Sequence, residues 1–197
     1  MEISIDLKEL INAVEKSEQR HILGIDWLSR SGKTTFVNQF SNILKKQNIP
    51  FHIFHIDDHI VGREKRYHTG HEEWYEYYQL QWDIEWLKMN LLKKLRKENQ
   101  LKLPFYDEKT ESQEFRQVTL PKKGLIIVEG VFLQREKWRE IYDTVVYLNC
   151  SRERRFSREA ETTKQNIEKF KNRYWKAENY YLDHVNPLSK ADIIINT

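Results

Sequence analysis

Cysteine and long apolar runs are scarce in this sequence of 197 residues, and each absence excludes a class of structure. Cys150 is the only cysteine, so no disulfide can form within the chain, and this usage suits a reducing compartment. No apolar run approaches the length that a membrane-spanning helix needs. The first residues mix charged and apolar side chains, unlike a secretory signal peptide. We therefore expect a soluble, cytoplasmic protein.

An excess of charge of one sign is also missing. The 33 Lys and Arg residues nearly balance the 30 Asp and Glu residues, for a formal net charge of +3. Because the signs also alternate along the chain, we expect neither nucleic acid nor a membrane as a partner. With 39% hydrophobic and 13% aromatic residues, and no repeat, low-complexity tract or linker, the chain suits one folded α/β domain over residues 1–197. The oligomeric state, including a homo-oligomer, stays open.

A candidate phosphate-binding loop lies in residues 22–36, which read ILGIDWLSRSGKTTF. A short apolar strand breaks into small polar residues, and a G-K-T sequence then opens a segment with helical spacing. The free N–H groups and the dipole of a helix start attract a phosphate chain. We expect Lys33 to reach the terminal phosphates and the Thr34 hydroxyl to hold Mg²⁺. The predicted cofactor-binding residues are Ser29, Arg30, Ser31, Gly32, Lys33, Thr34 and Thr35.

One position departs from the phosphate-loop pattern G-x-x-x-x-G-K-[ST]. Trp27 stands where the first glycine belongs, and Gly24 lies too far upstream to replace it. Trp cannot take positive φ values as cheaply as Gly can. A chance S-G-K-T-T sequence at a helix start is the alternative to a phosphate loop.

Carboxylates follow two further predicted strands. Asp57 and Asp58 end the apolar residues 51–56, and Glu129 ends the near-continuous apolar run 124–128. In an open parallel sheet the ligand crevice lies beyond the carboxyl ends of the strands, so these side chains should border the phosphate loop. There Asp57 could accept the proton of a substrate hydroxyl, and Glu129 could assist Mg²⁺. Solvated residues at strand ends are the alternative.

Two helical regions frame these strands in the sequence. Residues 59–82 are aromatic and polar, and they suit either a mobile segment facing the substrate or aromatic side chains that cover the sheet. Arg155 and Arg158 share one face of a helix over residues 151–159, where guanidinium groups could stabilise a transferring phosphoryl group. A solvated basic helix is the alternative, and the acidic residues Glu153 and Glu159 argue against contact with nucleic acid.

Five ordered elements resemble the uridine kinase and phosphoribulokinase family of phosphate-loop kinases. They span nearly everything after the predicted N-terminal helix of residues 1–20. The elements are GIDWLSRSGKTT at 24–35, Asp57-Asp58, PFYDEKT at 104–110, IVEG at 127–130 and NPLSKADIII at 186–195. The resemblance implies an α/β P-loop NTPase fold with a five-stranded parallel sheet and helices on both faces. It also implies ATP, Mg²⁺, and transfer of the γ-phosphate to a hydroxyl.

The resemblance assigns roles to individual residues. Asp57 matches the general base, Tyr106 matches a residue that lines the nucleoside pocket, and Arg155 and Arg158 match arginines of a lid around residues 150–180. Asp83 matches the last residue of the pattern that begins the family's substrate helix. Asp58 lies beside the base and is predicted to face the substrate with Tyr106 and Asp83. Lys33 completes the predicted catalytic set.

Two further departures concern the acceptor rather than the nucleotide. Glu111 stands where uridine kinases have a base-recognising histidine, and Tyr77 stands where the sugar-binding aspartate belongs. The sequence therefore predicts an ATP-dependent kinase of a small hydroxyl compound, with nucleosides first among its substrates. A nucleoside monophosphate kinase and a non-catalytic nucleotide-binding protein are the alternatives.

Overall fold

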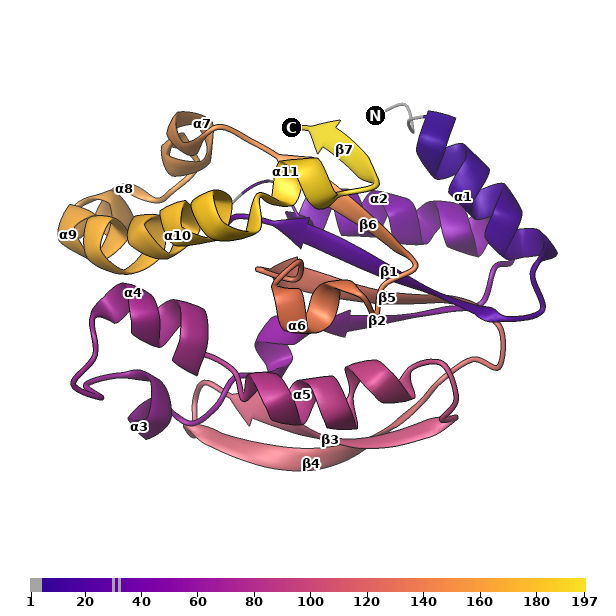
Figure 1. Cartoon of the computed structure of the whole chain (residues 1–197), viewed down its shortest axis with the longest axis horizontal. Coiled ribbons are helices and arrows are strands. Elements are labelled where there is room, and N and C mark those ends of the chain that lie inside the picture. Colours follow the sequence, from indigo (N-terminus) through magenta and orange to yellow (C-terminus); the bar gives the residue numbers. More distant parts are fainter. Residues whose placement is uncertain (1–4, 30, 32) are drawn as a thin grey trace.

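A parallel sheet of five strands forms the centre of the computed structural model, which describes residues 5–29, 31 and 33–197 (Figure 1). In order across the sheet, the strands are β2 (Phe51–His55), β5 (Gly124–Val131), β1 (Arg20–Trp27), β6 (Thr144–Asn149) and β7 (Ile193–Asn196). Every residue of β5 is buried, because the strand lies inside the sheet and both of its faces are covered. The predicted five-stranded parallel sheet is confirmed.

Helices cover both faces of this sheet. They are α1 (Ile5–Lys16), α2 (Lys33–Lys46), α5 (Ile84–Asn90), α6 (Glu136–Arg139), α10 (Lys176–Val185) and α11 (Pro187–Lys190). In Figure 1, α2 lies behind the sheet and α6 lies in front of it. α1 buries Leu7, Ile11 and Val14, whose spacing places them on one face of the helix. None of the helices within the described residues is long and apolar enough to cross a membrane.

Two groups of short helices extend past the carboxyl ends of the strands and face each other in Figure 1. The first group is α3 (Arg63–Arg66), α4 (Glu73–Tyr75) and the π-helical η2 (Glu76–Leu80); the second is α7 (Arg152–Ser157), α8 (Glu161–Lys164), α9 (Ile167–Lys169) and the π-helical η4 (Phe170–Trp175). Tyr77, Tyr78 and Trp82 are buried, and all three rings pack edge-on against Phe132. These aromatic residues of the 59–82 segment therefore belong to the core.

A separate antiparallel hairpin consists of β3 (Gln100–Asp107) and β4 (Ser112–Thr119), and it follows the short 3₁₀ turn η3 (Leu92–Lys94). His59 ties this hairpin to the sheet. Its Nδ1 lies 2.7 Å from the carbonyl oxygen of Pro104, which can only accept a hydrogen bond, so Nδ1 carries the proton. Burial lowers the pKa of His59, which favours this neutral form.

Strand β2 ends in a 3₁₀ turn, η1 (Ile56–His59), which carries Asp57 and Asp58. The turn packs closely on β5, because a Cβ added at Gly130 would lie only 2.0 Å from Cγ2 of Ile56. Glycine at position 130 is therefore required for the turn to approach the sheet. The turn in this way brings both aspartates to the carboxyl end of β5.

Asp26, near the end of β1, is a fully buried carboxylate. It accepts hydrogen bonds from the Tyr181 hydroxyl (2.6 Å), the Gln134 side-chain amide (3.0 Å) and the Leu133 N–H (3.0 Å). Burial raises the pKa of Asp26 to about 6, although these hydrogen bonds favour the charged form. Asp26 thus joins β1 to α10 and to the residues that follow β5.

The raised pKa of Asp26 predicts a pH-dependent stability. Burial disfavours the ionised form of Asp26 in the folded state. The free energy of unfolding of the wild type should therefore fall by about 3 kcal/mol relative to that of Asp26→Asn as pH rises from about 4 through 6. Tyr181→Phe removes a bond to the carboxylate and should move this loss to higher pH. Urea unfolding of the three proteins between pH 4 and pH 8 measures both effects. Parallel curves for the wild type and Asp26→Asn would contradict the assignment.

Candidate active site

The predicted phosphate loop joins the end of β1 to the start of α2. Trp27 is the last residue of β1, buried and extended, so this position does not need the positive φ of a glycine. α2 starts at Lys33 and has no acidic residue in its first turn, which suits the binding of an anion at its N-terminus. Arg30 and Gly32 lie outside the described residues, and so do the side chains of Lys33 and Thr34. Thr35 is exposed in the first turn of α2.

Side chains from distant parts of the chain hold the backbone of this loop. Nη1 of Arg155 donates to the carbonyl oxygen of Ser29 at 2.9 Å, and Oγ1 of Thr197 donates to the carbonyl oxygen of Ser31 at 2.7 Å. Ser31 is buried and Ser29 is half-buried. Both carbonyls are therefore anchored by side chains from other elements.

Arg155 departs from the role expected of it. Its guanidinium is buried and bonds both carboxylate oxygens of Glu178, at 2.7 and 2.9 Å. Arg158 is exposed, so the two arginines do not form one pair that faces a phosphate. This differs from the expectation based on their spacing, because a buried guanidinium needs a buried counter-charge and Glu178 on α10 provides it. In this structure Arg155 supports the phosphate loop.

The predicted base lies close to this loop. The Tyr77 hydroxyl oxygen lies 3.3 Å from Oγ of Ser29, and the charge of Asp57 contributes, after burial, to raising the pKa of Tyr77. The Tyr77 hydroxyl thus contacts Ser29 of the loop and is influenced by the charge of Asp57. Asp57 is exposed and Asp58 is half-buried, so a small molecule could reach both.

Glu129 lies at the end of β5 and is almost fully buried. Its carboxylate pairs with Nδ1 of His55, the residue opposite it in the register of β2 and β5. Sequence reasoning missed His55, because only the pairing of two strands distant in sequence brings it to Glu129. A carboxylate held in this way at the carboxyl end of a central strand is suited to contact a metal ion or its water ligands.

Tyr106 is held by charged neighbours on the hairpin side. Its hydroxyl accepts a hydrogen bond from Nη2 of Arg66 at 2.9 Å and donates one to Glu111. Burial and the Glu111 contact raise its pKa. Glu111, which replaces the histidine of the uridine kinase pattern, therefore fixes Tyr106.

Asp83 has a structural role at the start of α5. Its carboxylate accepts a hydrogen bond from the Trp86 N–H at 2.9 Å and caps the helix. The side chain is exposed. Capping accounts for Asp83 without a substrate.

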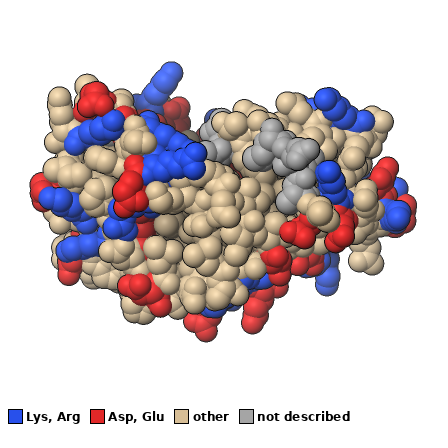
Figure 2. Space-filling model, turned by 90° about the horizontal axis from the view of Figure 1, so that it is seen from above, with Lys and Arg blue, Asp and Glu red and all other residues tan. Residues whose placement is uncertain are grey.

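Charges on the face shown in Figure 2 are mixed, with basic and acidic side chains side by side around a central area of other residues. Within the described residues, no three His, Cys, Asp or Glu side chains gather as a metal site. A metal ion at the candidate active site would therefore need ligands other than a cluster of three such side chains.

Comparison with known proteins agrees with this geometry. Residues 22–197 match the model of the phosphoribulokinase / uridine kinase family. A possible uridine kinase from Bacillus stearothermophilus is 48% identical, with a TM-score of 0.81 over 97% of this chain and 100% of that chain. A uridine kinase from Staphylococcus haemolyticus is 27% identical over 184 residues, 88% of this chain and 86% of the relative. Phosphoribulokinase from Rhodobacter spheroides, 14% identical with a TM-score of 0.63 over 91% of this chain and 71% of that chain, shares the fold.

The buried pair of Arg155 and Glu178 predicts a large effect of a neutral substitution. Glu178→Gln leaves a buried guanidinium without its counter-charge and should lower the free energy of unfolding by about 3 kcal/mol. Glu161→Gln is the matched control, because its partner Lys164 is on the surface, and it should change stability by less than about 1 kcal/mol. Urea denaturation measures both. Equal effects would show that the buried pair does not stabilise the fold.

Proposed function

Since the chain belongs to the phosphoribulokinase / uridine kinase family, whose members transfer phosphate to a hydroxyl group, we propose that it phosphorylates a nucleoside from Mg·ATP. The phosphotransferase class follows from the family, and the nucleoside is suggested by the relatives described as uridine kinases. The observation that supports the proposal for the site is the contact of the Tyr77 hydroxyl with Ser29, together with the influence of the Asp57 charge on the pKa of that hydroxyl. It supports a position of the predicted base near the predicted phosphate loop.

The nucleotide would bind at the N-terminus of α2. Backbone N–H groups of residues 29–35 and the ammonium of Lys33 would hold the phosphate chain, and Thr34 and Glu129 would hold Mg²⁺. Mg²⁺ would neutralise charge that develops on the phosphate oxygens. Arg155 would keep the Ser29 carbonyl in place, and Arg158, in a lid of residues 150–180, would contribute a positive charge.

The acceptor would approach from the side of η1 and the hairpin. Asp57 would accept the proton of the attacking hydroxyl, while Asp58 and Tyr106 would orient the molecule. A nucleoside monophosphate is disfavoured as the acceptor, because its phosphate would be repelled by Asp57 and Asp58. With one cysteine and no disulfide, a cytoplasmic location remains our expectation.

Asp57→Asn tests the proposed base. The variant should keep its affinity for Mg·ATP, measured by tryptophan fluorescence, but lose at least about a hundredfold in turnover with uridine, because the amide cannot accept the proton. Asp183→Asn, an exposed carboxylate on α10, is the control and should leave both quantities unchanged. Full turnover in Asp57→Asn would remove this residue from catalysis. Loss of Mg·ATP binding would instead indicate a role in holding the metal.

A further inference from the structure

Tyr77 is a buried side chain of η2 whose ring is held by other aromatic rings. It packs edge-on against Phe132, with ring centres 5.5 Å apart, and against Tyr174 of η4, with ring centres 5.0 Å apart. The ring centre of Trp82 lies 6.4 Å away. Because these rings hold Tyr77 in place, they also fix the direction of its hydroxyl.

A buried ion pair holds the residue directly before Tyr77. Glu76 is buried, and its carboxylate lies 3.2 Å from Nη1 of Arg173, on η4. The same carboxylate accepts hydrogen bonds from the N–H and the hydroxyl of Thr69, at 2.8 and 2.9 Å. Burial by itself would raise the pKa of Glu76, but the bonds from Thr69 and the charge of Arg173 lower it. Glu76 is therefore charged in the folded protein.

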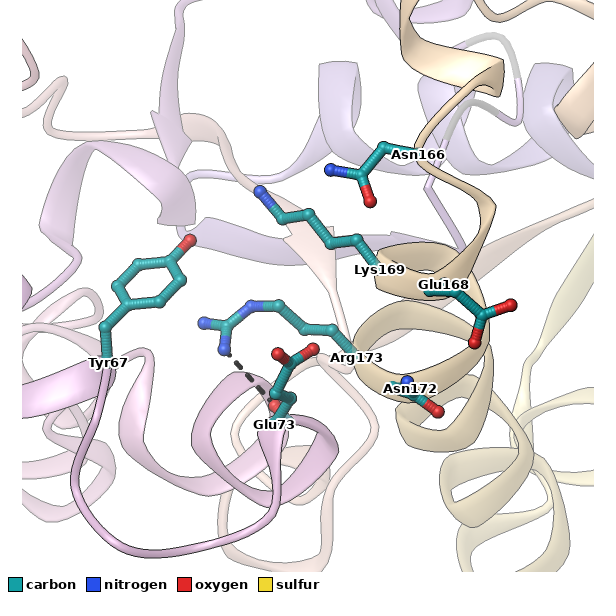
Figure 3. A pocket seen from close by; sticks show the side chains of 7 residues that line it. All are labelled: Tyr67, Glu73, Asn166, Glu168, Lys169, Asn172 and Arg173. Carbon is teal, nitrogen blue, oxygen red and sulfur yellow. Dashed lines mark hydrogen bonds between the residues drawn. The ribbon is translucent and has the colours of Figure 1, made fainter.

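Arg173 also binds the segment that leads to Tyr77. Figure 3 shows its side chain extending from η4 past Glu73 toward Tyr67, in the wall of a polar cavity of about 260 Å³. Its guanidinium is 1% exposed and donates to the carbonyl oxygens of Glu73 and Arg66, each at 3.3 Å. It also lies 4.1 Å from the centre of the Tyr67 ring. Residues 66–76 are thus folded around one buried guanidinium, and Tyr77 follows them directly.

The hydroxyl of Tyr77 is directed at the predicted phosphate loop, where its oxygen lies 3.3 Å from Oγ of Ser29. Burial, and then the charge of Asp57, raise the pKa of Tyr77, so the phenol keeps its proton. A phenol is a stronger hydrogen-bond donor and a weaker acceptor than an aliphatic hydroxyl, which favours donation from Tyr77 to Ser29. The one hydrogen of the Ser29 hydroxyl is then left for another acceptor.

A phosphate chain in the loop would supply such an acceptor, because its charged oxygens accept hydrogen bonds strongly. We propose that Tyr77 is a positioning residue of the phosphate loop: it donates to Ser29 and thereby directs the Ser29 hydroxyl hydrogen to an oxygen of the bound nucleotide. This inference rests on the proposed function and deepens it at the nucleotide site. An ionised aspartate, which the uridine kinase pattern has at position 77, can only accept a hydrogen bond and could not act in this way.

The test measures the dissociation constant of Mg·ATP by calorimetry for the wild type, Tyr77→Phe and Tyr78→Phe. Tyr77→Phe keeps the ring and removes only the hydroxyl, so it should weaken binding about fivefold, as the loss of one neutral hydrogen bond does. Tyr78→Phe is the matched control. Tyr78 also lies in η2 and packs on Phe132, but among the described residues its hydroxyl has no hydrogen bond to the loop. The control should leave the dissociation constant unchanged, and urea unfolding shows that each variant folds.

A double-mutant cycle with Ser29→Ala shows whether Tyr77 acts through Ser29. Ser29→Ala removes the acceptor of the Tyr77 bond and the hydrogen offered to the phosphate, so it should weaken Mg·ATP binding at least as much as Tyr77→Phe does. Adding Tyr77→Phe to Ser29→Ala should then change nothing further. A second loss of about fivefold in the double variant, or unchanged binding in Tyr77→Phe, would overturn the proposal.

Steady-state kinetics with uridine separate this inference from the proposed function. Tyr77→Phe should raise KM for ATP and leave KM for uridine unchanged. The opposite result would assign Tyr77 to the acceptor, so the positioning role would be wrong while the kinase assignment stands. If the wild type binds Mg·ATP but phosphorylates no nucleoside, the proposed function fails, and the binding cycle still decides the role of Tyr77. A wild type that does not bind Mg·ATP would overturn both.

Discussion

The parallel pairing of β5 with β1 on one side and β2 on the other is the constraint on which the rest of the site depends. It brings the ends of three strands together, so that the loop after β1, the turn after β2 and Glu129 of β5 share one edge of the sheet. Close packing of Ile56 on Gly130 fixes the turn that carries Asp57. The loop, the turn and Glu129 therefore lie together because of the backbone pairing of the strands.

The phosphate loop is stabilised by side chains that lie far from it in the sequence. Arg155, Thr197 and Tyr77 bond different atoms of Ser29 and Ser31, and Glu178 keeps Arg155 in place. These contacts link the loop to both of the helical groups that extend past the carboxyl ends of the strands. A movement of α7 or of the Tyr77 segment would therefore alter the contacts of Ser29.

The sequence predicted the sheet well and predicted that polar and acidic residues follow its strands, because both depend on local patterns. Apolar runs such as residues 124–128 identify a buried strand, and polar residues after them identify its ligand-binding end. Partners distant in sequence were not predictable. Arg155 pairs with Glu178 on another helix, and His55 meets Glu129 only through strand register. Asp83 caps α5, and its predicted contact with the substrate stays a prediction.

The most direct test of the account is a crystal structure with Mg²⁺, a non-hydrolysable ATP analogue and an acceptor. We predict that the triphosphate lies along residues 29–35 and that the Asp57 carboxylate lies within hydrogen-bond reach, about 2.6–3.2 Å, of the acceptor hydroxyl. A triphosphate bound elsewhere, or an Asp57 carboxylate directed away from the acceptor, would contradict the account.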